Sequence, residues 1–92
     1  MYVILIYDIK ADEQGPRVWS KTFKSCKKYL THVQKSVFEG EITEDKLLKL
    51  QKELGLFIRK DLDSVIVYET NNPKWLHRKM WALQEDKMDN FF

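Results

Sequence analysis

The spacing of apolar and polar residues predicts four strands and two helices. The range Tyr2 to Asp8 is rich in β-branched and aromatic residues, which is typical of a strand. His32 to Ile42 fits two short strands joined by a tight bend, and Asp63 to Thr70 fits a fourth strand. Helical spacing follows the first strand and again the third. The order β-α-β-β-α-β predicts an α+β fold of the ferredoxin-like type.

Each predicted helix has one apolar face. The first helix begins near Pro16, which suits a first helical position. Its apolar positions recur at spacings of four and three and are Trp19, Phe23, Cys26 and Leu30, and Val18 and Tyr29 widen this stripe. Thr43 is a good N-cap for the second helix, which we expect to close with the cations Arg59 and Lys60. The apolar stripe of the second helix consists of Leu47, Leu50, Leu54, Phe57 and Ile58.

The chain is predicted to consist of one domain and a C-terminal tail. Its 92 residues suffice for one domain, so we assign residues 1–73 to the ferredoxin-like domain and residues 74–92 to a C-terminal tail. The tail pattern fits a strand or a short helix. Cys26 is the single cysteine, which excludes an intramolecular disulfide. The sequence has neither a basic leader nor an apolar run of about 20 residues, so we expect a cytoplasmic protein without a membrane partner.

Both faces of the predicted sheet are apolar. Because strand side chains alternate, the first strand presents two sets, Val3, Leu5 and Tyr7 on one face and Tyr2, Ile4, Ile6 and Asp8 on the other. On the fourth strand the sets are Val65 and Val67 on one face, and Ile66 and Tyr68 on the other. Helices cover only one face of a ferredoxin-like sheet, and a large apolar patch is rarely left in water. We therefore expect a sheet-to-sheet homodimer whose edge gains a strand from the tail. The alternative is a tail that folds back over its own sheet.

Asp8 is the candidate for metal binding and catalysis. It ends an apolar strand on the proposed dimer face, where a carboxylate is costly unless it is paired or bound to a cation. Near a two-fold axis, two copies of Asp8 would approach each other and recruit a metal or share a proton. Oxygen ligands suit Mg²⁺, which could activate a water against a phosphodiester. The alternative is a strand-end residue that caps the following loop.

Positive charge concentrates in the first helix. Residues 10–35 carry seven Lys and Arg against two acids, whereas residues 36–72 carry five against eight. The spacing of four and three predicts one basic row that consists of Arg17, Lys21, Lys24 and Lys28. Such a row could neutralise several phosphates of a nucleic acid. An ordinary solvated helix face is the alternative.

The residues around these positions resemble a known family. Tyr7-Asp8-Ile9 is followed by a basic helix, by Val33-Gln34-Lys35-Ser36-Val37-Phe38-Glu39-Gly40 and by an Asp89-Asn90-Phe91-Phe92 ending. This pattern spans the chain and resembles the small CRISPR-associated adaptation proteins, the second of the two near-universal Cas proteins, which are described as endoribonucleases. Many members carry paired arginines at the first helix, where only Arg17 matches.

The resemblance implies a homodimer whose C-terminal strand pairs with the partner subunit and whose two Asp8 residues bind Mg²⁺. It implies a metal-dependent endonuclease that hydrolyses single-stranded RNA or double-stranded DNA and works with the CRISPR integrase in spacer acquisition. Tyr7, Ser36 and Phe38 are candidates to line the site, and a purely structural role is the alternative for Ser36 and Phe38.

Two other functions remain open from the sequence. A non-catalytic dimer could bind DNA as a scaffold that bridges integrase dimers. A toxin-like mRNA interferase could use the same fold, because a fold alone does not decide function.

Overall fold

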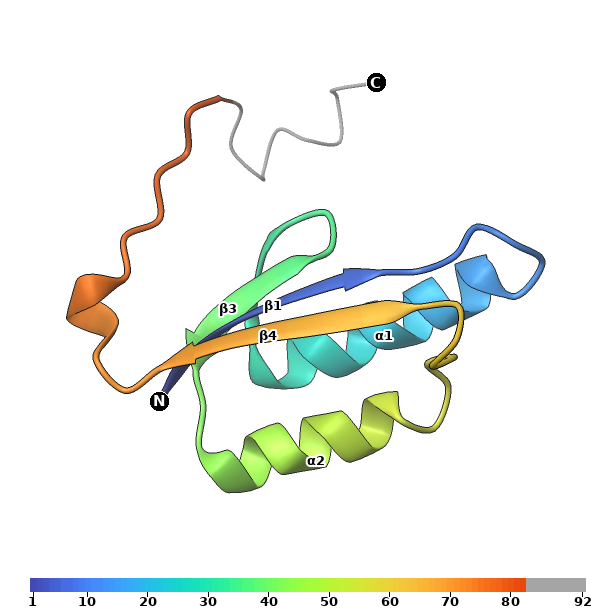
Figure 1. Cartoon of the computed structure of the whole chain (residues 1–92), viewed down its shortest axis with the longest axis horizontal. Helices are drawn as coiled ribbons and strands as arrows, with labels where there is room; N and C mark the ends of the chain where they lie inside the picture. The colour runs from blue at the N-terminus through green and yellow to red at the C-terminus, as the bar shows by residue number, and fades with distance from the viewer. Residues whose placement is uncertain (83–92) are drawn as a thin grey trace.

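The computed structural model describes residues 1–82, which form one sheet and two helices (Figure 1). The strands are β1 (Tyr2–Asp8), β2 (Thr31–Gln34), β3 (Val37–Glu41) and β4 (Ser64–Thr70). The helices are α1 (Gly15–Tyr29) and α2 (Glu44–Leu54), and a short 3₁₀ helix, η1, spans Pro73–Trp75. The order along the chain confirms the predicted β-α-β-β-α-β fold.

The sheet is antiparallel, with the strand order β2-β3-β1-β4. The central strand β1 pairs Ile6 with Val37 of β3 and pairs Asp8 with Ser64 of β4. Both helices lie on one side of the sheet, below the strands in Figure 1. The other side, which we call the open face, has no helix among the residues that the structure describes.

The core lies between the helices and the sheet, as the alternation in β1 predicts. Its buried apolar residues are Val3, Leu5, Tyr7, Cys26, Leu30, Phe38, Ile42, Leu50 and Leu54. Thr22 is also fully buried, and its hydroxyl donates to the carbonyl of Val18 at 2.7 Å. A buried hydroxyl is costly without such a partner.

Two details of the predicted helices are wrong. In α1 and at its C-cap, Val18, Cys26 and Leu30 are buried as the predicted stripe indicates, whereas Trp19 is 42% exposed. Trp19 instead stacks on Phe23, with ring centroids 5.3 Å apart.

The second helix is shorter than its apolar pattern indicates. Thr43 is its N-cap, as predicted, and its hydroxyl oxygen accepts from the amide of Lys46 at 3.3 Å. The helix ends at Leu54, whose carbonyl accepts from the amide of Ile58 at 2.8 Å in a following turn. Arg59 lies beyond the end of the helix and does not close it. Its guanidinium instead pairs with the carboxylates of Asp12 and Asp63.

The tail leaves the sheet at Thr70 and forms η1. Arg78 then pairs with Glu39, with Nε 3.0 Å from Oε2, and so reaches the open face of its own sheet. Residues 76–82 form no strand, and residues 83–92 lie outside the described part of the chain. The extra strand that we assigned to residues 74–92, and its pairing with a partner subunit, stay predictions.

Candidate functional site

Asp8 lies at the end of β1 on the open face. Its register partner is Ser64, and its neighbours two and four residues earlier on the same face are Ile6 and Ile4. The residue is exposed, and its carboxylate makes no hydrogen bond or ion pair within residues 1–82. Capping of the following loop is therefore not its role in the single chain. The carboxylate is free to accept an external ligand.

Ser36 lies at the same end of the sheet as Asp8. Its carbonyl accepts from the amide of Tyr7 at 3.1 Å, which places the β2–β3 turn beside the last residues of β1. The side chain of Ser36 is partly buried. Among the three candidates to line the site, only this side chain is accessible, and its role stays a prediction.

Tyr7 and Phe38 are core residues and do not line an open site. Tyr7 is 2% exposed and Phe38 is fully buried, and their rings stack with centroids 6.1 Å apart. Both side chains point to the helices, because Tyr7 alternates with Asp8 and Phe38 pairs with Leu5. Burial raises the pKa of the Tyr7 phenol to about 12. These two site candidates are corrected to packing residues.

The basic row of α1 lies in the helix layer and borders α2. Lys28 pairs with Glu53 of α2, and Lys21 lies 5.9 Å from the ring centroid of Phe57. Arg17 and Lys24 are exposed. Asp8 alternates with the buried Tyr7 and so faces away from the helices, which means that one chain does not bring the basic row and the carboxylate into a single site.

A second aspartate, which the sequence did not indicate as important, lies next to Ser64, the register partner of Asp8. Asp63 precedes β4, and its side chain is fully buried. It accepts from the guanidinium of Arg59 and from the amide of Lys10, two residues beyond Asp8. The hydrogen bonds from Arg59 hold the pKa of Asp63 at about 2, below the ordinary 3.8. An arginine four residues before an aspartate was the available signal.

One chain does not supply a complete metal site. Within residues 1–82 no group of three His, Cys, Asp or Glu side chains is placed to hold an ion. The free carboxylate of Asp8 is nevertheless the kind of hard oxygen donor that Mg²⁺ prefers. The donor set fits Mg²⁺ only if a second copy adds its own Asp8.

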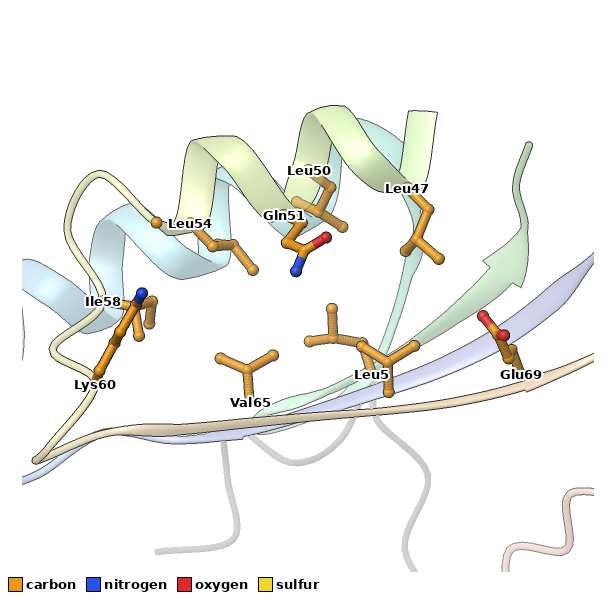
Figure 2. Close-up of a pocket in the computed structure, with 11 residues that line it drawn as sticks. Leu5, Leu47, Leu50, Gln51, Leu54, Ile58, Lys60, Val65 and Glu69 are labelled. Atoms are coloured by element: carbon orange, nitrogen blue, oxygen red, sulfur yellow. The ribbon is translucent and has the colours of Figure 1, made fainter. Parts of the chain in front are cut away.

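A groove of about 600 Å³ lies between α2 and β4 (Figure 2). Leu47, Leu50 and Leu54 of α2 point toward Leu5 and Val65 across it. The groove exists because α2 packs mainly against α1 and leaves the helix-facing side of β4 partly uncovered. It is separated from Asp8 by the sheet.

No helix within residues 1–82 combines the length and the hydropathy that a membrane span needs.

A family of known proteins matches most of the chain. Residues 1–78 match the family described as CRISPR associated protein Cas2.

Two curated relatives cover nearly the whole chain. The chain is 50% identical over 91 residues to the CRISPR-associated endoribonuclease Cas2 of Fusobacterium nucleatum, an alignment that covers 99% of this chain and 86% of the relative. It is 43% identical over 90 residues to the CRISPR-associated endoribonuclease Cas2 2 of Moorella thermoacetica, with 97% and 99% covered.

A solved structure has the same fold. The crystal structure of Streptococcus pyogenes Cas2 at pH 6.5 superposes with a TM-score of 0.76 and 26% identity, over 87% of this chain and 99% of that chain. The strand order, the exposed aspartate at the end of β1 and these matches lead to one conclusion: the chain belongs to the Cas2 family of CRISPR-associated proteins.

Proposed function

We propose that this protein is a homodimeric, Mg²⁺-dependent endonuclease that hydrolyses phosphodiester bonds of single-stranded RNA or double-stranded DNA. We also propose that it works with the CRISPR integrase in spacer acquisition. The observation that carries the nuclease proposal is the free carboxylate of Asp8 on an apolar face. The names of the curated relatives, which are endoribonucleases, support the same reaction class.

The open face supports the homodimer. Ile66 is 48% exposed and Tyr68 is 61% exposed, and they pair with Ile6 and Ile4 of β1 on the same face. Burial of apolar side chains contributes roughly 25 cal/mol per Å². Packing against a second open face would remove these side chains from water, and it would bring the two copies of Asp8 toward a common axis.

Two copies of Asp8 would hold Mg²⁺ between the subunits. When bound, Mg²⁺ supplies positive charge beside the scissile phosphate and a water with a lowered pKa. Asp8 contributes ligand oxygens, and the apolar open face limits access of bulk water. One carboxylate per chain is a small ligand set, so we expect slow cleavage that requires the dimer.

Asp8→Asn tests the nuclease directly. The variant keeps the size of the side chain and removes the charge that attracts a cation, so Mg²⁺-dependent cleavage should be lost. Asp61→Asn is the matched control, because Asp61 is also an exposed carboxylate near β4. Cleavage of RNA and DNA substrates, with and without a chelator, measures the difference. Equal cleavage by wild type and Asp8→Asn would contradict the proposal.

A non-catalytic scaffold is the second candidate. The separation of the basic row from Asp8 favours it, because the exposed Arg17 and Lys24 could contact DNA without any metal. In that case Asp8→Asn should leave spacer acquisition intact. Arg17→Glu with Lys24→Glu should weaken DNA binding and its salt dependence. Lys46→Glu with Lys49→Glu, on exposed positions of α2, is the matched control for charge.

A further inference from the structure

The loops behind Asp8 are held by one arginine and one buried aspartate. Nε of Arg59 lies 3.0 Å from Oδ2 of Asp63, and Nη2 lies 2.9 Å from Oδ1, so the pair is bidentate. The amide of Arg59 also donates to Oδ2 of Asp63 at 2.9 Å. The amide of Asp63 in turn donates to the carbonyl of Arg59 at 2.7 Å. The two residues therefore form a closed unit ahead of β4.

Arg59 and Asp63 both form hydrogen bonds with the backbone of Lys10, two residues after Asp8. The amide of Lys10 donates to Oδ1 of Asp63 at 2.9 Å, and the carbonyl of Lys10 accepts from Nη2 of Arg59 at 3.2 Å. Nη1 of Arg59 lies 2.7 Å from both carboxylate oxygens of Asp12. Both backbone groups of Lys10 are thus fixed by side chains from a segment about 50 positions later.

Gly15, the first residue of α1, also lies close to the backbone of Lys10. A Cβ atom on Gly15 would lie 2.5 Å from the carbonyl oxygen of Lys10. The amide of Gly15 donates to the carbonyl of Asp12 at 3.1 Å. The segment from Lys10 to Asp12 therefore has little freedom to shift. We call Arg59, Asp63 and Asp12, with the Lys10 backbone, the loop clamp.

The loop clamp holds the backbone that directly follows Asp8. Asp8 and Ser64 are the last pair of the β1–β4 ladder, so the clamp begins directly beyond them. The Asp8 carboxylate has no partner of its own within residues 1–82, and its position therefore depends on the backbone alone. A site with one carboxylate from each chain tolerates little displacement of either one.

We propose that Arg59 and Asp63 are positioning residues that set the place of the Asp8 carboxylate for binding a divalent cation. They do not touch the ion. The inference rests on the proposed role of Asp8 and deepens it. Partners that hydrogen-bond a metal ligand directly typically change metal affinity about 10- to 100-fold, and residues that act through the backbone should have a smaller effect.

The test measures Mn²⁺ affinity by electron paramagnetic resonance on the full chain, without nucleic acid. Arg59→Lys keeps the charge but loses the bidentate fork, and Asp12→Asn removes one arm of the loop clamp while leaving Asp63 paired. We expect weaker Mn²⁺ binding for Arg59→Lys, with a loss below the roughly tenfold loss that removal of a direct partner causes. A smaller loss is expected for Asp12→Asn. Glu53→Gln, which breaks the Lys28 pair in the helix layer, is the matched control and should bind as wild type.

Two further readouts separate positioning from folding. Circular dichroism and mass identify the variants that keep the wild-type fold and oligomeric state. Amide hydrogen exchange at residues 9–12 should accelerate in both clamp variants. If Arg59→Lys does not fold, Asp12→Asn decides the question. Wild-type Mn²⁺ affinity in a folded Asp12→Asn or Arg59→Lys protein overturns the inference alone. Equal Mn²⁺ binding by wild type and Asp8→Asn would instead overturn the proposed function, and the inference with it.

Discussion

The two faces of the sheet have the same apolar pattern but different surroundings. On the helix side, Leu5 is 1% exposed beneath α1 and α2. On the open side, Ile66 and Tyr68 are about half exposed. Each face also has an aspartate at the same end. Asp63 is buried and fully hydrogen-bonded, whereas Asp8 is exposed and unpartnered within residues 1–82. The comparison teaches that the covered face builds the fold and that the open face is available for function.

Leu5→Ala should give the largest effect on the covered face. It removes a buried side chain from the centre of the core, so the free energy of unfolding should fall by about 2–5 kcal/mol. Urea unfolding followed by circular dichroism measures the loss. Because the residue faces away from the dimer surface, the loss should be the same at every protein concentration. A concentration-dependent loss would show that the two faces are not energetically separate.

Ile66→Lys tests the open face. The buried ammonium should block sheet-to-sheet packing, and light scattering at micromolar concentration should report about 11.1 kDa instead of twice that mass. The variant should also abolish any rise of the unfolding midpoint with protein concentration. Leu56→Lys is the matched control, because Leu56 is 84% exposed in the loop after α2. A dimeric Ile66→Lys protein would place the interface elsewhere.

Acid should remove the stability that the Asp63 ion pair provides. The folded chain holds the pKa of Asp63 at about 2, below its ordinary 3.8, so the unfolded chain takes up the proton first. The stability that Asp63 provides is therefore present above about pH 4 and is lost as the pH falls through about 2. Unfolding midpoints between pH 5 and pH 2 should decline less steeply in Asp63→Asn than in wild type. An equally steep decline in Asp63→Asn and in wild type would contradict this assignment.

The smallest expected effect is the labelling of the Cys26 thiol in the native protein. Burial raises its pKa to about 12 and shields it from solvent. A thiol reagent at pH 8 should label the native protein only as fast as it opens, and should label it at once in denaturant. Rapid labelling of the native protein would mean that the covered face is not closed.

The alternation of side chains made both faces predictable. A period of two placed Leu5 and Ile4 on opposite faces without any structure. The same rule did not place Phe38, because its direction follows from the register with Leu5, which the sequence does not reveal. The sequence therefore leaves open whether Phe38 lines the site or is structural, and the structure places it in the core.

Contacts between distant segments account for the other differences. The helical period found the basic row, but the pairing of Lys28 with Glu53 depends on how α1 packs on α2. Arg59 follows the apolar stripe of the second helix, so local spacing predicts a helix-closing cation, whereas its partner Asp12 lies 47 positions away. Local patterns carry no information about such partners, so the loop clamp was found only in the structure.

In the proposed dimer, two open faces meet and place two copies of Asp8 around one cation. The number of Mn²⁺ ions bound per chain tests this arrangement most directly, because it counts sites and subunits together. Equilibrium dialysis should give one high-affinity ion per two chains in wild type and none in Asp8→Asn. One ion per single chain, or the same binding in Asp8→Asn, would rule out a cation shared between two copies of Asp8.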